Sequence, residues 1–210
     1  MRIATKEFKI LTYNELNEEA KEKVKQWLLD DDIRCKFFEE DINSYLEEEF
    51  RNSDLKVNFS LSSCQGDGLN IEGSVNLYDI LPKLESYTNK EIKTLQHYFG
   101  KIDTSYTFKS NNEYGYSCKF IDMKYIESCV DDLIEELRYW QYKNIKKELI
   151  LRFYTDMIDY FEELDKKFEK DGYQYLYEMD EDEASDTCEA NEYEFFEDGT
   201  FCNKIYAFEM

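Results

Sequence analysis

Cys64 is the residue whose chemistry is easiest to name, because it opens a glycine-rich turn. The turn comprises Cys64, Gln65, Gly66, Asp67 and Gly68. A cysteine can act as a nucleophile when a base lies within hydrogen-bonding reach, and His97 is the single histidine. No protease signature surrounds Cys64, so a Cys64-dependent enzyme is an alternative only. We favour a structural turn, in which the glycines adopt positive φ, Asp67 caps and Cys64 packs as a small apolar residue.

Carboxylates are the second group that could do chemistry, and they form two clusters. The clusters are Glu39, Glu40, Asp41, Glu47, Glu48 and Glu49, and Glu181, Asp182, Glu183, Glu189, Glu192 and Glu194. Their oxygens could hold a divalent cation for metal-dependent catalysis. Adjacent acids on a helix point in different directions, however, and 180–183 lacks the ligand spacing and glycine of an EF-hand. We therefore expect no metal and no cofactor.

The net charge limits the classes of partner. The chain has 48 Asp and Glu against 26 Lys and Arg, a net charge of −22, and residues 171–203 contain no Lys or Arg. Such a surface repels nucleic acid and anionic membranes and favours basic protein partners. The sequence shows no basic, aromatic surface of the kind that contacts phosphates, so we expect no direct nucleic-acid binding. A nucleotide held by the glycine turn is a further alternative.

Cysteine spacing and hydropathy bear on the compartment. None of the six cysteines forms a CxxC-type pair, so a zinc site is not expected. No apolar run reaches the roughly 18 residues of a membrane span, and the N-terminus lacks the apolar region of a signal peptide. We expect a cytoplasmic protein with reduced thiols and no membrane contact.

Two predicted hairpins supply a sheet. Apolar residues alternate through Val57, Phe59 and Leu61, and resume at Leu69 and Ile71 after the turn, which is typical of a β-hairpin. A second alternation in 102–108 and 114–120 predicts two more strands. The fold class is therefore α+β, with a four-stranded antiparallel sheet from 55–77 and 101–121 covered by amphipathic helices.

Helical periodicity places helices on both sides of these hairpins in the chain. The predicted helices are 12–29, with a capping box of Thr12 and Glu15, 34–50, a turn at 79–84, 89–99 and 122–170. Gly100 is expected to be a left-handed cap and Gly172 to end the last helix. Fifty helical residues would span roughly 75 Å, so 122–170 is expected to break near 142–147. A single long helix that forms a homodimer is the alternative.

The C-terminal segment is expected to form a separate element. Residues 180–190 can form a helix, 192–196 a strand, and 197–200 a turn into 201–208. Aromatic residues alternate with the acids, which favours an ordered segment. We expect a core domain over 1–170 and an acidic helix plus hairpin over 171–210 that docks on it.

Three segments resemble a known group of proteins. They are TYNELNEEAKEKVKQWL at 12–28, FSLSSCQGDG at 59–68 and ANEYEFFEDGTF at 190–201. They are similar to segments of a family of small acidic bacteriophage and prophage proteins. The resemblance implies a phage protein acting in a bacterial host cell, and it brings no activity and no catalytic residues.

Acidity and this resemblance together suggest a function. We expect a phage counter-defence protein, similar to an anti-CRISPR protein, that inhibits a host nucleic-acid-binding effector. Its two carboxylate clusters would mimic DNA and bind a basic surface, on a CRISPR effector or a restriction enzyme. The alternatives are a phage regulator or scaffold that binds a host protein without mimicry, an antitoxin-like partner, and the enzymes named above.

Overall fold

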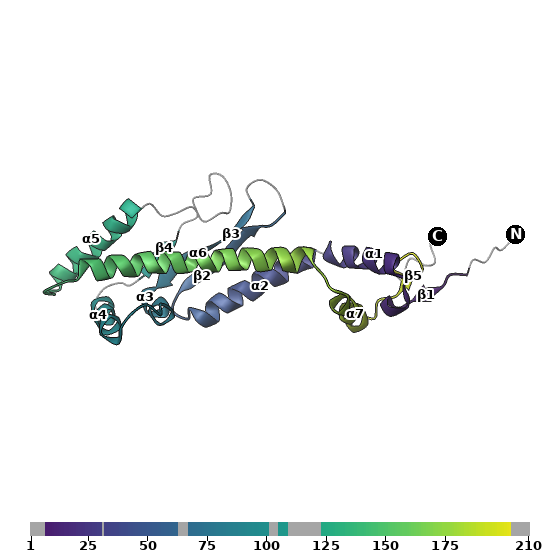
Figure 1. Cartoon of the computed structure of the whole chain (residues 1–210), viewed down its shortest axis with the longest axis horizontal. Helices are drawn as coiled ribbons and strands as arrows, with labels where there is room; N and C mark the ends of the chain where they lie inside the picture. Colours follow the sequence, from purple (N-terminus) through teal and green to yellow (C-terminus); the bar gives the residue numbers. More distant parts are fainter. Residues whose placement is uncertain (1–6, 31, 63–66, 101–104, 109–122, 203–210) are drawn as a thin grey trace. The chain divides into compact units, whose positions relative to one another are not determined.

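The protein is α+β and folds into two compact units (Figure 1). The computed structural model describes residues 7–30, 32–62, 67–100, 105–108 and 123–202. We call Met1–Phe37 with Tyr173–Met210 the terminal unit, and Phe38–Gly172 the central unit. The sequence predicted a boundary near residue 170 but grouped the N-terminal segment with the core. In the structure that segment groups instead with the C-terminal segment.

The terminal unit joins elements from both ends of the described chain. Its elements are β1 (Ile10–Leu11), the 3-10 helix η1 (Tyr13–Glu15), α1 (Glu18–Leu29), α7 (Glu181–Ala190) and β5 (Phe195–Phe196). β1 and β5 pair antiparallel, with Leu11 opposite Phe195. The predicted C-terminal helix is confirmed by α7. The bridge between Phe195 and Phe201 confirms the start of the predicted hairpin, whereas 203–208 lie outside the described residues.

A small aromatic core holds the terminal unit together. Its buried side chains are Tyr13, Leu16, Ala20, Val24, Leu28, Ala184, Cys188 and Phe195. The apolar residues of α1 recur at helical spacing, so that one face of the helix is buried against α7 and β5. Trp27 packs at the edge of this core, where its ring stacks on that of Phe201 with the ring centroids 4.9 Å apart.

The central unit contains a sheet of three described strands in the order β2-β3-β4. The strands are β2 (Asp54–Ser60), β3 (Gly68–Asn76) and β4 (Ser105–Phe108). Val57 lies opposite Ile71 and Phe59 opposite Leu69, so the first predicted hairpin is confirmed. The described residues form a sheet of three strands and not the predicted four. The predicted return strand at 114–120 lies outside the described residues.

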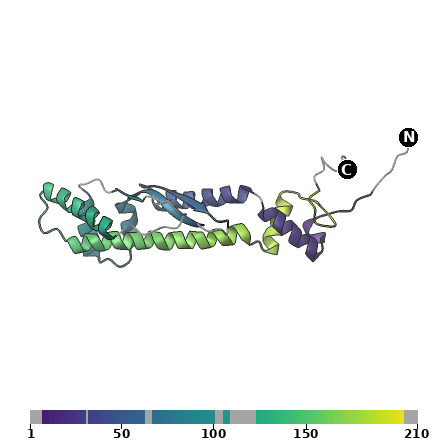
Figure 2. The ribbon, with the colours of Figure 1, turned by 90° about the horizontal axis from the view of Figure 1, so that it is seen from above.

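Helices surround this sheet. They are α2 (Asp32–Glu49), α3 (Leu77–Ile80), the 3-10 helix η2 (Leu81–Lys83), α4 (Asn89–Phe99), α5 (Met123–Tyr139) and α6 (Lys147–Tyr177). The predicted division of 122–170 into two helices is confirmed. α6 runs along the sheet in two perpendicular views (Figures 1 and 2), and its Tyr154 ring lies 5.5 Å from Tyr106 of β4.

Side chains from two helices cap backbone donors of the sheet. Asn43 Oδ1 of α2 accepts a hydrogen bond from the Val57 N–H at 3.0 Å. The buried Asp165 of α6 accepts from the Ile71 N–H at 2.9 Å. Exposed strand edges invite pairing with other chains, so the Asn43 cap protects β2, which is an outer strand of the described sheet.

Helix ends differ from the sequence prediction at three places. Glu15 does accept a hydrogen bond from the Thr12 N–H, as a capping box requires, and a second one from the Thr12 hydroxyl, but it closes a 3-10 turn. α1 begins only at Glu18, because Asn17 caps it by accepting from the Ala20 N–H at 2.9 Å. The predicted left-handed cap is also wrong, since Gly100 has φ −70°.

Gly172 does not end α6, which continues to Tyr177. A Cβ at position 172 would lie 2.5 Å from Leu61 Cδ1 and 2.6 Å from Phe38 Cζ. The glycine therefore permits close packing of the helix, and its helix-breaking tendency of about 1 kcal/mol is overridden.

Candidate functional site

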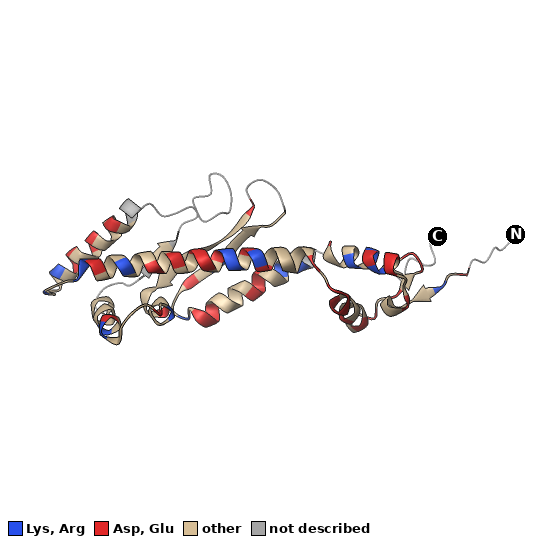
Figure 3. Ribbon diagram, viewed as in Figure 1, with Lys and Arg blue, Asp and Glu red and all other residues tan. Residues whose placement is uncertain are grey.

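The first predicted cluster occupies the outer face of α2. Its six carboxylates are exposed, while Phe38, Ile42 and Leu46 of the same helix are buried. This separation follows from the 3.6-residue period, which places the apolar residues on one face and the acids on the remaining surface. Figure 3 shows the acidic bands along α2.

Most of these carboxylates lack a counter-charge. Glu49 pairs with Lys83, which lowers the pKa of the Glu49 carboxyl through a hydrogen bond and charge attraction. Among the described residues, no ion pair involves the other five, Glu39, Glu40, Asp41, Glu47 and Glu48. The acidic face of α2, meaning these five residues, is therefore available to an outside partner. We use that name for them below.

The carboxylates of the second predicted cluster have different surroundings in the terminal unit. Glu181 pairs with Lys21, and Glu183 pairs with Arg34 at 3.2 Å, all within the terminal unit. Asp180 caps α7 by accepting from the Glu183 N–H at 2.8 Å. Acids in a first helical turn also interact favourably with the helix dipole. Glu181 and Glu183 therefore act mainly in holding α7 against its own unit.

The other members of this cluster lie elsewhere on the terminal unit. Asp182, Glu189 and Glu192 are exposed and Glu194 is half-buried. Glu189, Glu192 and Glu194 line a cavity of about 510 Å³, together with Tyr13 and Cys188. Two of the six carboxylates of this predicted contact surface are thus engaged in ion pairs of the terminal unit itself. Burial raises the pKa of the Cys188 thiol to about 11, so it is protonated at neutral pH and a poor nucleophile.

A third acidic row was not predicted. Glu127, Asp131, Asp132, Glu135 and Glu136 are all exposed on α5, where Asp131 pairs with Lys147. Glu127, Asp131 and Glu135 recur every four residues in the sequence, as do Asp132 and Glu136, and this spacing is the signal that predicts such a row. This row gives the central unit a second helix with excess negative charge (Figure 3).

One surface of the central unit is basic, which the sequence analysis did not predict. A cleft of about 1040 Å³ lies between α4 and the connection from α5 to α6. It is lined by Lys90, Lys93, His97, Trp140, Tyr142 and Lys143, among others. We call it the basic cleft. Its residues come from two segments that are distant in the sequence, so no local motif predicts this cleft.

The predicted turn can be placed only in part. Cys64, Gln65 and Gly66 lie outside the described residues. Asp67 does accept hydrogen bonds from the hydroxyls of Ser60 at 3.1 Å and Ser62 at 3.2 Å, as expected of a capping residue.

The nucleophile and metal hypotheses find no assembled site among the described residues. The His97 ring packs at 4.8 Å from Tyr142, which lies in the basic cleft. Within the described ranges, no three His, Cys, Asp or Glu side chains gather in the geometry of a metal site. None of the described helices combines the length and apolar content needed to cross a membrane.

Glu91 makes the stability of the central unit depend on pH. The hydroxyl and N–H of Thr88 donate to its carboxylate at 2.7 and 2.9 Å, and Arg152 donates at 3.0 Å. These bonds lower its pKa to about 2. A carboxyl whose pKa is depressed on folding stabilises fully above its unfolded pKa, and that contribution is lost as pH falls towards the folded value.

We therefore expect Glu91→Gln to be less stable than the wild type at neutral pH, with the difference shrinking between about pH 4.5 and pH 2. Urea unfolding at a series of pH values measures this difference. The exposed Glu85, which has no ion pair among the described residues, supplies the control Glu85→Gln. A difference for Glu91→Gln that stays constant with pH would contradict the assignment.

Comparison with known proteins gives no relative. No protein-family model, no curated protein and no solved structure matches this chain. What the protein does is therefore inferred from its own surfaces.

Proposed function

We propose that the protein binds a basic, nucleic-acid-binding surface of another protein through the acidic face of α2. The observation that carries this proposal is the set of five exposed carboxylates with no ion pair among the described residues. In a chain of net charge −22, these groups attract a basic partner and repel nucleic acid.

The spacing of the carboxylates supports mimicry of a phosphate backbone. From Glu39 to Glu48 the helix rises roughly 14 Å, at about 1.5 Å per residue. Five charges over this length give one per about 3.4 Å, which is comparable to one strand of duplex DNA. They form two groups, 39–41 and 47–48, separated by roughly 9 Å of helix axis. A groove built for phosphates could accept both groups.

The resemblance of three segments to phage proteins supports the choice of target. It suggests that the partner is a host defence effector, such as a CRISPR effector, in the bacterial cytoplasm. The protein would then act by stoichiometric inhibition, without a catalytic residue or cofactor, and compete with the effector's DNA or RNA.

Charge reversal on α2 tests the proposal. Capture from a host lysate at low and high salt identifies the partner, and competition by its DNA or RNA shows which surface is bound. We expect Glu40→Lys with Glu47→Lys to slow association about tenfold at low salt, because charges at an interface mainly set the association rate. Surface plasmon resonance measures this rate.

A matched variant separates local contact from net charge. Asp159→Lys with Glu163→Lys makes the same change in charge on exposed positions of α6 in the same unit. We expect it to alter the association rate less than threefold. An equal loss in both variants would indicate net charge alone, and unchanged binding of the α2 variant would refute the proposed surface.

A further inference from the structure

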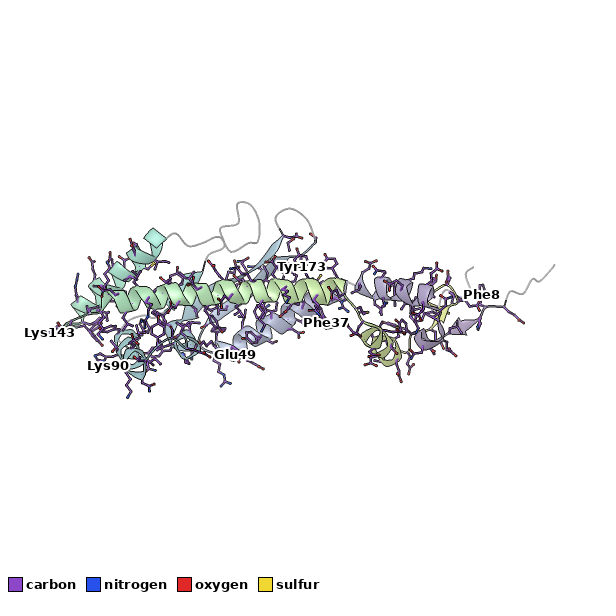
Figure 4. The ribbon with its side chains drawn as sticks, in the orientation of Figure 1. Phe8, Phe37, Glu49, Lys90, Lys143 and Tyr173 are labelled. Carbon is purple, nitrogen blue, oxygen red and sulfur yellow. The ribbon has the colours of Figure 1, made fainter. Side chains whose placement is uncertain are left out.

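The basic cleft concentrates positive charge in a strongly acidic chain. Lys90 and Lys93 come from α4, and Lys143 comes from the connection between α5 and α6. Figure 4 labels Lys90 and Lys143, which lie at the same end of the central unit. Among the described residues, no Asp or Glu lines the cleft.

These lysines are unneutralised among the described residues. No ion pair there involves Lys90, Lys93 or Lys143, whereas neighbouring Lys147 and Arg152 pair with Asp131 and Glu91. Three free ammonium groups around one cleft form a site suited to an anion. An anion carrying several charges could contact more than one of them.

Aromatic rings give the cleft a second chemical character. Trp140 is 52% exposed, and its ring packs edge-to-face with that of Tyr139 at 5.6 Å. About half of this side chain is therefore accessible to a planar ligand. Tyr142, by contrast, is held in the wall of the cleft by contacts with His97. Its ring packs on the His97 ring, and its hydroxyl donates a hydrogen bond to the His97 carbonyl at 2.8 Å.

The connection that carries Trp140 and Lys143 is held in a defined conformation. Gln141 and Asn144 adopt left-handed φ values of 62° and 58°. The Tyr142 N–H donates to the Leu137 carbonyl at 3.0 Å, and Tyr98 of α4 accepts from the Lys146 N–H at 3.3 Å. Such fixed backbone reduces the ordering that binding must otherwise impose.

We propose that the basic cleft binds a nucleoside phosphate, with the lysines contacting the phosphates and Trp140 stacking on the base. The volume of about 1040 Å³ is at the upper end of small-ligand sites, so a nucleotide fits. Aromatic side chains stack on bases of any identity, and lysines contact phosphates as point charges.

The surrounding charge favours a mononucleotide over a polynucleotide. A longer strand leaving the cleft would meet the acidic row of α5, which includes Glu135 and Glu136 just before Trp140. A mononucleotide stays within the cleft and does not extend along this row. This site is separate from the acidic face of α2, and its test does not depend on that proposal.

Fluorescence of Trp140 tests the proposal directly. The chain has two tryptophans, so Trp27→Phe leaves Trp140 as the single reporter. We expect ATP, GTP and their diphosphates to quench this emission saturably, and calorimetry on the unmodified chain to give the same dissociation constant. Trp140→Ala should weaken binding about tenfold or more, as loss of one stacked base predicts. Lys90→Ala, Lys93→Ala and Lys143→Ala should each weaken it roughly threefold.

Matched controls and competing ligands define the outcomes. Phe37→Ala removes an exposed aromatic ring that does not line the cleft, and Lys167→Ala removes an exposed lysine of α6; neither should change the affinity. Inorganic triphosphate and unphosphorylated adenosine should each bind more weakly than ATP. Equal binding of triphosphate and ATP would mean that the cleft binds anions without recognising the base, and would overturn the proposed stacking on Trp140. Tighter binding of single-stranded oligonucleotide or of a poly-glutamate peptide, or no binding of any nucleotide, would overturn the proposal.

Discussion

Replacing Phe195 with alanine is expected to lower the free energy of unfolding of the terminal unit by about 3–5 kcal/mol. Phe195 is fully buried, and its ring lies 6.1 Å from both Trp27 and Phe201. Its removal leaves a cavity where α1, α7 and β5 meet. Globular domains are stable by only about 5–15 kcal/mol, so a loss of this size could unfold a small unit at room temperature.

Trp27 reports this transition, because it packs on Phe195 and Phe201 and is the single tryptophan of the terminal unit. Urea unfolding followed by its fluorescence in a Trp140→Phe background measures the loss. Phe37→Ala is the control, since Phe37 is 53% exposed and its loss should cost less than about 1 kcal/mol. Similar losses in the two variants would mean that the packing at Phe195 has been misassigned.

Gly73→Ala is expected to destabilise the central unit by at least about 3 kcal/mol. Gly73 has φ +121°, a conformation that L side chains rarely adopt, and it lies opposite Leu55 in the ladder. A Cβ there would lie 2.0 Å from the Asp54 carbonyl oxygen, which is backbone and cannot rotate away. Conformational strain of about 1–3 kcal/mol adds to the cost of moving the strand.

Urea unfolding followed by circular dichroism and by Trp140 fluorescence measures this effect. Gly100→Ala makes the same chemical change at φ −70°, where the nearest atoms to the new Cβ are the Tyr78 hydroxyl at 3.0 Å and the Gln96 carbonyl oxygen at 3.2 Å. Small shifts of these two groups should suffice, so we expect a loss below about 1 kcal/mol. If Gly73→Ala were as well tolerated as Gly100→Ala, the close approach of β2 and β3 would be refuted.

Periodicity predicted those parts of the fold that local sequence determines. The alternation around Val57 and Ile71 predicted the first hairpin, and the spacing of Ile92, Leu95 and Phe99 predicted α4 with both ends correct. Length alone predicted the break between α5 and α6. Helix ends were harder, because Thr12 and Asn17 are both good caps and only tertiary packing decides which one starts α1.

Features that depend on distant residues could not be predicted. Whether Gly172 ends a helix depends on Leu61 and Phe38, which pack against it from other elements. Helical spacing predicted that the acidic residues are exposed. It could not predict which of them form ion pairs with Lys or Arg. Glu181 and Lys21 are separated by 160 residues, so their pairing reflects how the two ends of the chain meet.

That meeting of the chain ends has a consequence during synthesis. The central unit, Phe38–Gly172, is an insertion within the terminal unit, whose α1 is translated before it and whose α7 and β5 are translated after it. At about 5–20 residues per second, α1 waits on the order of 10–30 s for its partners to be made. During this interval its apolar face, including Val24 and Leu28, has no native cover, whereas the central unit is complete as soon as Gly172 has been added. A ribosome-bound chain would therefore expose α1 to chaperones for longer than any element of the central unit.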